Sequence, residues 1–382
     1  MTTKPKHTSL ARPDLGKYGR NEWSILGTPC GEIKKLANEL IQRLHQRWQI
    51  AYIDADHKGE EGPDNPFLEA GATLHYTDKI SYKRFDYLTD LNEHQIKSFF
   101  QSMDLVLLNG NHFESKAQIV VIDPAKSLEK KLDKLTNVQL VLLKESDTLR
   151  PAFLTEILAG KTVLPFQATD AIADYLEKQL LGQRPVLNGL VLAGGLSTRM
   201  QRDKGLLNYH GKPQREVAYE LLSEFCSEVY VSCRKDQVAE LEGKFNCIPD
   251  TFLGLGPKGG ILSAFRHNPN AAWLVLACDL PFLNTETLNY LVENRHSTKA
   301  ATAFLDSENK FPEPLITIYE PKCYPILLQM LGMGYACPRK TLINADVALL
   351  QAPDFHALTN INAPQEYEEA IKQLQHNTTP PS

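Results

Sequence analysis

The chain has 382 residues, 42% hydrophobic and 23% charged, which is enough for two or three globular domains and excludes a single small module. Its formal charge of −5 offers no broad positive surface, so we expect no nucleic-acid partner. The seven cysteines form no C-x-x-C pair, which favours reduced thiols over a disulfide framework or structural zinc. No segment approaches the ~18 apolar residues of a membrane span, and the polar start lacks a leader-like apolar stretch. We expect a cytoplasmic protein without a membrane partner.

Apolar runs alternate with a helical pattern along the first half. From Ile33 to Leu44, apolar residues recur at i, i+3, i+4 and i+7, which predicts an amphipathic helix after a Gly/Pro turn. Alternating strands and helices favour a mostly parallel α/β sheet. The predicted strands are 23–26, 50–53, 105–108, 119–122 and 138–143.

A break at 181–185 follows a predicted helix at 171–180 and precedes a fresh strand at 186–193. The second half alternates again, so we expect two doubly wound sheets. Its further predicted elements are helices at 217–225 and 261–265 and strands at 229–233 and 273–278. The expected domains are 21–183 and 186–374, between a flexible N-terminus, 1–20, and a flexible tail, 375–382.

The strongest motif is LVLAGGLSTRMQRDKGLL at 190–207. A buried strand leads into Gly194 and Gly195, where the missing Cβ atoms let backbone N–H groups approach a phosphate. Ser197, Arg199 and Lys204 follow within ten residues of the second glycine. The alternative is a Gly-Gly turn followed by solvated basic residues, but the whole ordered set favours a nucleoside triphosphate site.

This segment resembles the molybdenum cofactor guanylyltransferases, whose pattern is LAGGxSxRMGxDK. The resemblance extends over nearly the whole second half, because further elements of the family follow in the expected order. They are VSCR at 231–234, Asp250, GPKGG at 256–260, CDLPF at 278–282, EPL at 313–315 and NINAP at 360–364.

The resemblance implies a Rossmann-like nucleotidyltransferase domain that transfers GMP from GTP to molybdopterin, the organic part of the molybdenum cofactor, and releases pyrophosphate. It implies Lys204, Arg199 and Asp279 as catalytic residues that neutralise charge, with Asp279 holding Mg²⁺ at a strand end. For Asp279 the alternative is a helix N-cap. The implied contacts to base, ribose and phosphates are Leu192, Ala193, Gly194, Gly195, Ser197, Arg234 and Asp250, and those to the pterin are Asn360 and Asn362.

Three departures from the family pattern leave base selectivity open. Gln201 replaces a glycine beside the triphosphate loop, Lys258-Gly259 replaces Leu-Ala, and Gln214-Arg215 replaces two apolar residues. We expect Lys258 to bring a charge to the guanine-side loop. The alternatives are a CTP-dependent or sugar-phosphate nucleotidyltransferase, or a non-catalytic carrier that delivers the cofactor. Molybdoenzymes and other cofactor-biosynthesis proteins are further possible partners.

The first half resembles the GTP-binding companion protein of the same pathway in the order of its elements. GTPCGEIK at 27–34 stands where that family has its phosphate loop (P-loop), but Ile33 replaces the phosphate-binding Lys and Lys34 the Mg²⁺-binding Ser/Thr. Asn109 replaces a Glu of the family. The Asp and His residues at 54–57 allow a metal site, but a solvated loop is the simpler interpretation. We expect a degenerate P-loop domain with a structural or partner-binding role.

Overall fold

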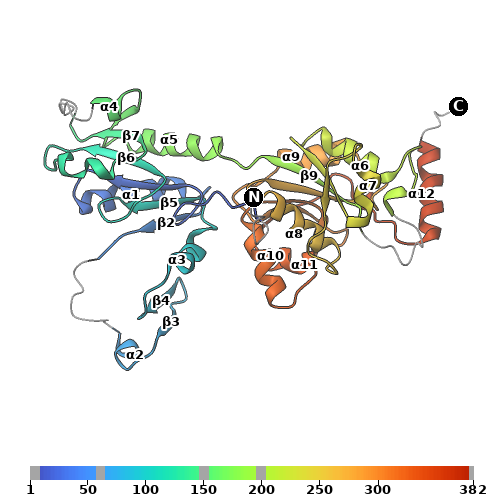
Figure 1. Ribbon diagram of the computed structural model, residues 1–382, viewed down its shortest axis with the longest axis horizontal. Coiled ribbons are helices and arrows are strands. Elements are labelled where there is room, and N and C mark those ends of the chain that lie inside the picture. The colour runs from blue at the N-terminus through green and yellow to red at the C-terminus, as the bar shows by residue number, and fades with distance from the viewer. Residues whose placement is uncertain (1–8, 57–64, 146–154, 195–203, 378–382) are drawn as a thin grey trace, which may run out of the picture. The chain divides into compact units, whose positions relative to one another are not determined.

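The computed structural model describes residues 9–56, 65–145, 155–194 and 204–377 (Figure 1). The chain divides into two compact units, and each is described by itself. The N-terminal unit is Asp14–Gln183, and the C-terminal unit is Arg184–Ser382 together with Met1–Pro13. None of the helices within the described ranges is long and apolar enough to cross a membrane.

The N-terminal unit is built on a parallel sheet with the strand order β2-β5-β1-β6-β7-β8. Helices α1 and α5 pack together over one face, and the apolar residues predicted from Ile33 to Leu44 lie buried in that layer. The elements around the sheet are β1 (Glu22–Leu26), α1 (Cys30–Leu44), β2 (Ile50–Ile53), β5 (Leu105–Asn109), β6 (Ala117–Ile122), η1 (Glu129–Lys134), β7 (Val138–Leu143), α4 (Thr155–Leu158), β8 (Thr162–Pro165) and α5 (Thr169–Gly182).

A segment between β2 and β5 stands outside this sheet. It forms an antiparallel hairpin in which Leu74 pairs with Tyr87 and Asp78 with Lys83. The sequence analysis predicted no element here, because exposed aromatic residues in both strands obscure the hydrophobic alternation that it relies on. The segment contains α2 (Pro66–Glu69), β3 (Leu74–Asp78), β4 (Lys83–Tyr87) and α3 (Glu93–Phe100).

Residues 14–20 lie within the stretch expected to be a flexible N-terminus, but they belong to the N-terminal unit. The buried Glu22 side chain accepts hydrogen bonds from the backbone N–H groups of Lys17, Tyr18 and Gly19, at 3.2, 2.8 and 3.2 Å. A buried carboxylate needs such donors, so this segment is held against β1.

The C-terminal unit has a mixed sheet with the strand order β11-β10-β9-β12-β14-β13-β15. Strands β11 to β12 in this order are parallel, whereas β14 is antiparallel to both of its neighbours. Apolar side chains cover both faces. The sheet strands are β9 (Leu187–Leu192), β10 (Val229–Cys233), β11 (Cys247–Pro249), β12 (Ala272–Ala277), β13 (Ala301–Leu305), β14 (Pro312–Tyr319) and β15 (Val347–Leu350).

The helices of this unit begin earlier or end later than their apolar spacing suggests. The helix with apolar spacing at 261–265 spans Pro257–His267, so it begins within the GPKGG motif, with Pro257 at its first position. Two glycines in its first turns pack against neighbouring segments. The last helix continues past Gln375, where a tail was expected. The helical elements are η3 (Lys204–Leu206), α6 (Gln214–Ser223), η4 (Lys235–Gln237), α7 (Val238–Leu241), α8 (Pro257–His267), α9 (Thr285–Glu293), α10 (Cys323–Gly332), α11 (Pro338–Ile343), η5 (Phe355–Leu358) and α12 (Pro364–Asn377).

Candidate functional site

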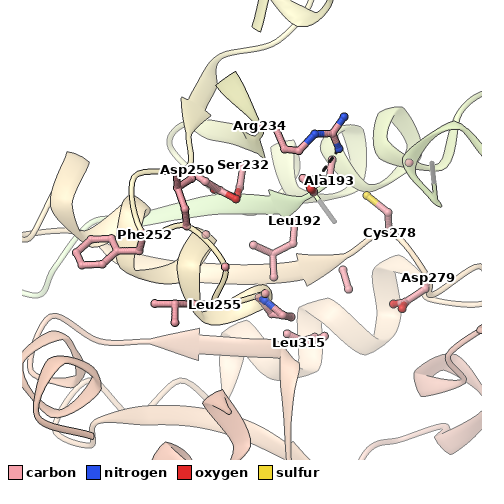
Figure 2. A pocket seen from close by; sticks show the side chains of 18 residues that line it. Leu192, Ala193, Ser232, Arg234, Asp250, Phe252, Leu255, Cys278, Asp279 and Leu315 are labelled. Atoms are coloured by element: carbon pink, nitrogen blue, oxygen red, sulfur yellow. Dashed lines mark hydrogen bonds between the residues drawn. The ribbon is translucent and has the colours of Figure 1, made fainter. Parts of the chain in front are cut away.

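A cavity of about 370 Å³ opens at the carboxyl ends of β9, β10 and β12, the edge where open parallel sheets bind ligands (Figure 2). It is lined by apolar side chains and a small number of charged ones, a composition typical of small-molecule sites. The lining residues are Leu192, Ala193, Gly194, Gly205, Ser232, Arg234, Asp250, Phe252, Leu253, Gly254, Leu255, Gly256, Pro257, Gly260, Ala277, Cys278, Asp279 and Leu315.

The strand register brings these distant segments together. Leu192, at the end of β9, pairs with Ser232 of β10 on one side and with Ala277 of β12 on the other. The chain then continues into Ala193, whose N–H donates to the Ser232 carbonyl at 3.1 Å. The residues that follow these neighbouring parallel strands therefore meet at one edge of the sheet.

Asp250 and Arg234 supply opposite charges on the β10–β11 side of the cavity. Asp250 Oδ1 accepts a hydrogen bond from Ser232 Oγ at 2.6 Å, and burial raises the pKa of this carboxyl above its ordinary value. The Arg234 guanidinium donates to the Gly194 carbonyl at 3.4 Å and forms an ion pair with Asp236 at 3.2 Å. Both residues thus lie beside Gly194, where the predicted phosphate-binding loop begins.

Asp279 lies at the other end of the lining, directly after β12 (Figure 2). It does not cap a helix, because α9 begins at Thr285 and Asn284 is its N-cap. No cluster of three or more His, Cys, Asp or Glu side chains suited to a metal occurs among the described residues. A single carboxylate facing a cavity fits Mg²⁺, which proteins bind through one or two carboxylates together with substrate phosphates.

The loop before α8 forms one wall, and its contacts correct an expectation about Lys258. Gly256 has φ +55° and precedes Pro257 at the first helical position. Lys258 was expected to place a charge at the cavity, but its side chain is fully buried and does not line it. Its Nζ donates to the Tyr335 carbonyl at 2.7 Å and to Thr341 Oγ1 at 3.3 Å. Desolvation lowers the pKa of this lysine, and the side chain ties α8 to α11.

The polar residues at the start of α6 are structural. Gln214 Nε2 donates to the Leu280 carbonyl at 3.2 Å, and Arg215 forms an ion pair with Glu240 at 2.7 Å. Both side chains are buried, and these partners offset part of the cost of burying polar groups where the family pattern has apolar ones.

Several predicted residues are not placed at the cavity. Gly195, Ser197, Arg199 and Gln201 lie outside the described residues, as does the side chain of Lys204. Asn360 and Asn362 do not line the cavity. They flank Ile361, whose N–H donates to the Asp279 carbonyl at 2.9 Å, so this segment lies next to the Asp279 backbone.

The sequence analysis missed the part of the lining between β11 and α8. Phe252, Leu253 and Leu255 face the cavity from this loop, and Leu315 does so from β14. Ser232, Gly260 and Leu315 stand within the quoted motifs but were given no role. The signal in the sequence was the pair of glycines at 254 and 256, and in the structure both have positive φ.

The loop between β1 and α1 in the N-terminal unit carries neither phosphate-binding side chain of a P-loop. Ile33 is fully buried in the core, and Lys34 lies 3.7 Å from Asp54 in an ion pair. Asn109, at the end of β5, donates to the same Asp54 carboxylate at 2.8 Å. Asp54 is thereby committed to interactions within the unit, while His57 lies outside the described residues.

Residues 189–349 match the MobA-like NTP transferase domain, a range that includes every segment lining the cavity. A probable molybdenum cofactor guanylyltransferase from Flavobacterium johnsoniae is 31% identical over 191 residues, which cover 48% of this chain and 95% of the relative. The chain belongs to the molybdenum cofactor guanylyltransferase family. It is therefore a nucleotidyltransferase, as the motif at 190–207 predicted.

Two further proteins are similar to parts of this chain. A molybdenum cofactor biosynthesis bifunctional protein from Synechocystis is 35% identical over 183 residues, and the match spans 47% of this chain but only about half, 52%, of that relative. The solved structure of a molybdopterin-guanine biosynthesis protein B aligns with 42% of this chain and 99% of its own, with 16% identity and a TM-score of 0.30.

Proposed function

We propose that the C-terminal unit transfers GMP from GTP to molybdopterin and releases pyrophosphate. The observation that carries this proposal is the cavity at the ends of β9, β10 and β12, with Asp250 and Asp279 at its two ends, inside the segment that matches the family. The volume of the cavity suits a nucleotide. Of its two acidic residues, Asp250 suits recognition of the base and Asp279 suits a Mg²⁺ ion.

The reaction needs positioning and charge neutralisation more than a protein nucleophile. An oxygen of the terminal phosphate of molybdopterin forms a bond to the α-phosphorus of GTP, while the bond between the α-phosphorus and the bridging oxygen of pyrophosphate breaks. Leu192, Ala193 and Gly194 border the base and ribose. Asp250 accepts hydrogen bonds from guanine N–H groups, and Arg234 lies beside the phosphate loop.

Asp279 would hold Mg²⁺, and that ion neutralises phosphate charge when bound. Lys204 and Arg199 supply the cations of the triphosphate loop, with Gly195 and Ser197 as further loop contacts. Asn360 and Asn362, which flank the segment bonded to Asp279, contact the pterin. The N-terminal unit serves a structural or partner-binding role, because its loop after β1 lacks the lysine that binds phosphate.

The test is a calorimetric titration of the full chain with GTP, CTP, ATP and UTP in the presence of Mg²⁺, followed by an assay of pyrophosphate release with molybdopterin. We expect selective GTP binding and molybdopterin-dependent release, with turnover lowered about 10²-fold or more in Lys204→Ala. Selective CTP binding would instead support the cytidylyl alternative. Cofactor delivery by a preloaded protein without any pyrophosphate release would support the carrier.

A further inference from the structure

The Asp250 carboxylate is held by a neighbouring hydroxyl group rather than by a cation. Ser232 Oγ, from β10, donates to Asp250 Oδ1 at 2.6 Å, and both residues line the nucleotide cavity (Figure 2). Ser232 is only 1% exposed. A hydrogen bond to a charged acceptor is short and strongly directional, so it fixes the rotation of the carboxyl group.

Two glycines show how closely this pair is surrounded. A Cβ atom on Gly260 would lie 2.5 Å from Ser232 Oγ, and one on Gly194 would lie 3.1 Å from Asp250 Oδ2. The first distance means that α8 packs directly on the hydroxyl group. The second means that the oxygen not bonded to Ser232 points toward the loop that follows β9. The Asp250 carboxylate therefore has Oδ1 directed at the Ser232 hydroxyl group and Oδ2 directed at Gly194.

We propose that Ser232 is a positioning residue for base selection: it fixes the Asp250 carboxylate so that Oδ2, beside Gly194, accepts hydrogen bonds from the bound base. This inference rests on the proposed GTP-dependent function. Ser232 makes no contact with the reacting atoms. It acts on the base only through the orientation of Asp250.

The chemistry of the bases explains why this orientation selects guanine. Guanine presents a ring N1–H and an exocyclic amino group side by side, and a fixed carboxylate can accept from both. Adenine and cytosine carry a ring-nitrogen acceptor next to their amino group. The lone pair of that ring nitrogen would repel the lone pairs of the carboxylate. Burial raises the pKa of Asp250, and the hydrogen bond from Ser232 opposes that rise.

The experiment is a double-mutant cycle on the full chain with Ser232→Ala, Asp250→Asn and the double variant, measured by GTP binding and steady-state kinetics. We expect Ser232→Ala to raise the KM for GTP about tenfold with kcat nearly unchanged, the size of one hydrogen bond to a charged group. Its preference for GTP over inosine triphosphate, which lacks the amino group, should fall. In the Asp250→Asn background, Ser232→Ala should add no further loss.

Ser223→Ala is the matched control, since that exposed hydroxyl group on α6 donates only to the Tyr219 carbonyl at 2.8 Å and should leave all parameters unchanged. Ser232→Cys preserves the side-chain shape with a weaker donor, so an intermediate KM supports the proposal. It also serves the same cycle if Ser232→Ala does not fold. Full additivity of the two substitutions, or unchanged GTP binding by Ser232→Ala, overturns the inference alone. Absence of GTP binding by the wild-type protein overturns the proposed function and this inference with it.

Discussion

Replacing Gly260 with alanine is expected to damage both the stability and the nucleotide affinity of the C-terminal unit. The new methyl group would lie 2.5 Å from Ser232 Oγ and 2.7 Å from Leu192 Cδ2, well inside ordinary van der Waals separation. Because both neighbours belong to buried strands, the strain must be relieved by shifting α8 or the two side chains. Overpacking of this kind costs about 1–3 kcal/mol of unfolding free energy. For a unit of this size that corresponds to a melting-temperature loss of about 2–12 °C.

The measurements are thermal unfolding and the KM for GTP of Gly260→Ala beside Gly332→Ala. Gly332 ends α10 in the same unit with no positive φ, and a Cβ there would meet nothing within 4 Å. The control substitution should be neutral or stabilise by about 0.4–1 kcal/mol. We expect the KM to rise only in Gly260→Ala, because the displaced Ser232 hydroxyl group holds Asp250. A Gly260→Ala protein with wild-type stability and KM would refute the argument that α8 packs on this hydroxyl group.

Three further outcomes follow from the structure. Asp279→Asn should lower pyrophosphate release about 10²-fold or more while leaving the circular dichroism spectrum unchanged, since the residue lies after a strand end; retained activity would contradict the metal assignment. Calorimetry should find one GTP per chain, and a second site would contradict our account of the segment at 27–34, in which Ile33 is buried at the start of α1. Arg295→Met should destabilise the C-terminal unit by about 3–5 kcal/mol, because it strands the buried Glu320 carboxylate that Arg295 contacts at 2.6 and 3.0 Å. Equal unfolding midpoints for Arg295→Met and the exposed-pair control Lys310→Met would count against that expectation.

Local patterns predicted β1, β2, β5, β6 and β7 of the N-terminal sheet and β9, β10 and β12 of the C-terminal sheet, because continuous apolar runs and helical spacing indicate burial directly. The strands β8, β11, β13, β14 and β15 were not predicted. The strand of the 190–207 motif and the helix after Ile33 are confirmed for this reason. Periodicity failed where a neighbour decides the conformation. Helix α8 contains two glycines at close contacts, so only the folded sheet shows why its first turns are helical.

The same limit applies to the site. Asp279 was identifiable from the apolar strand before it, whereas the Phe252–Leu255 wall depends on the path of an irregular loop. Lys258 was misplaced because a sequence departure shows the residue type but not the direction of its side chain. Its hydrogen-bond partners, Tyr335 and Thr341, are far along the chain and give no local signal.

If the N-terminal unit binds no phosphate, as we propose, the position of Ile33 makes that property difficult to reverse. Its side chain is fully buried within the core that joins α1 to the sheet. Returning a lysine to this position would place an unpaired ammonium group among apolar side chains, at a cost of several kcal/mol. The fold would therefore be weakened before any phosphate contact was regained. Recovery of a working loop requires coordinated changes in the loop and in the core beneath it, and no single substitution can supply both.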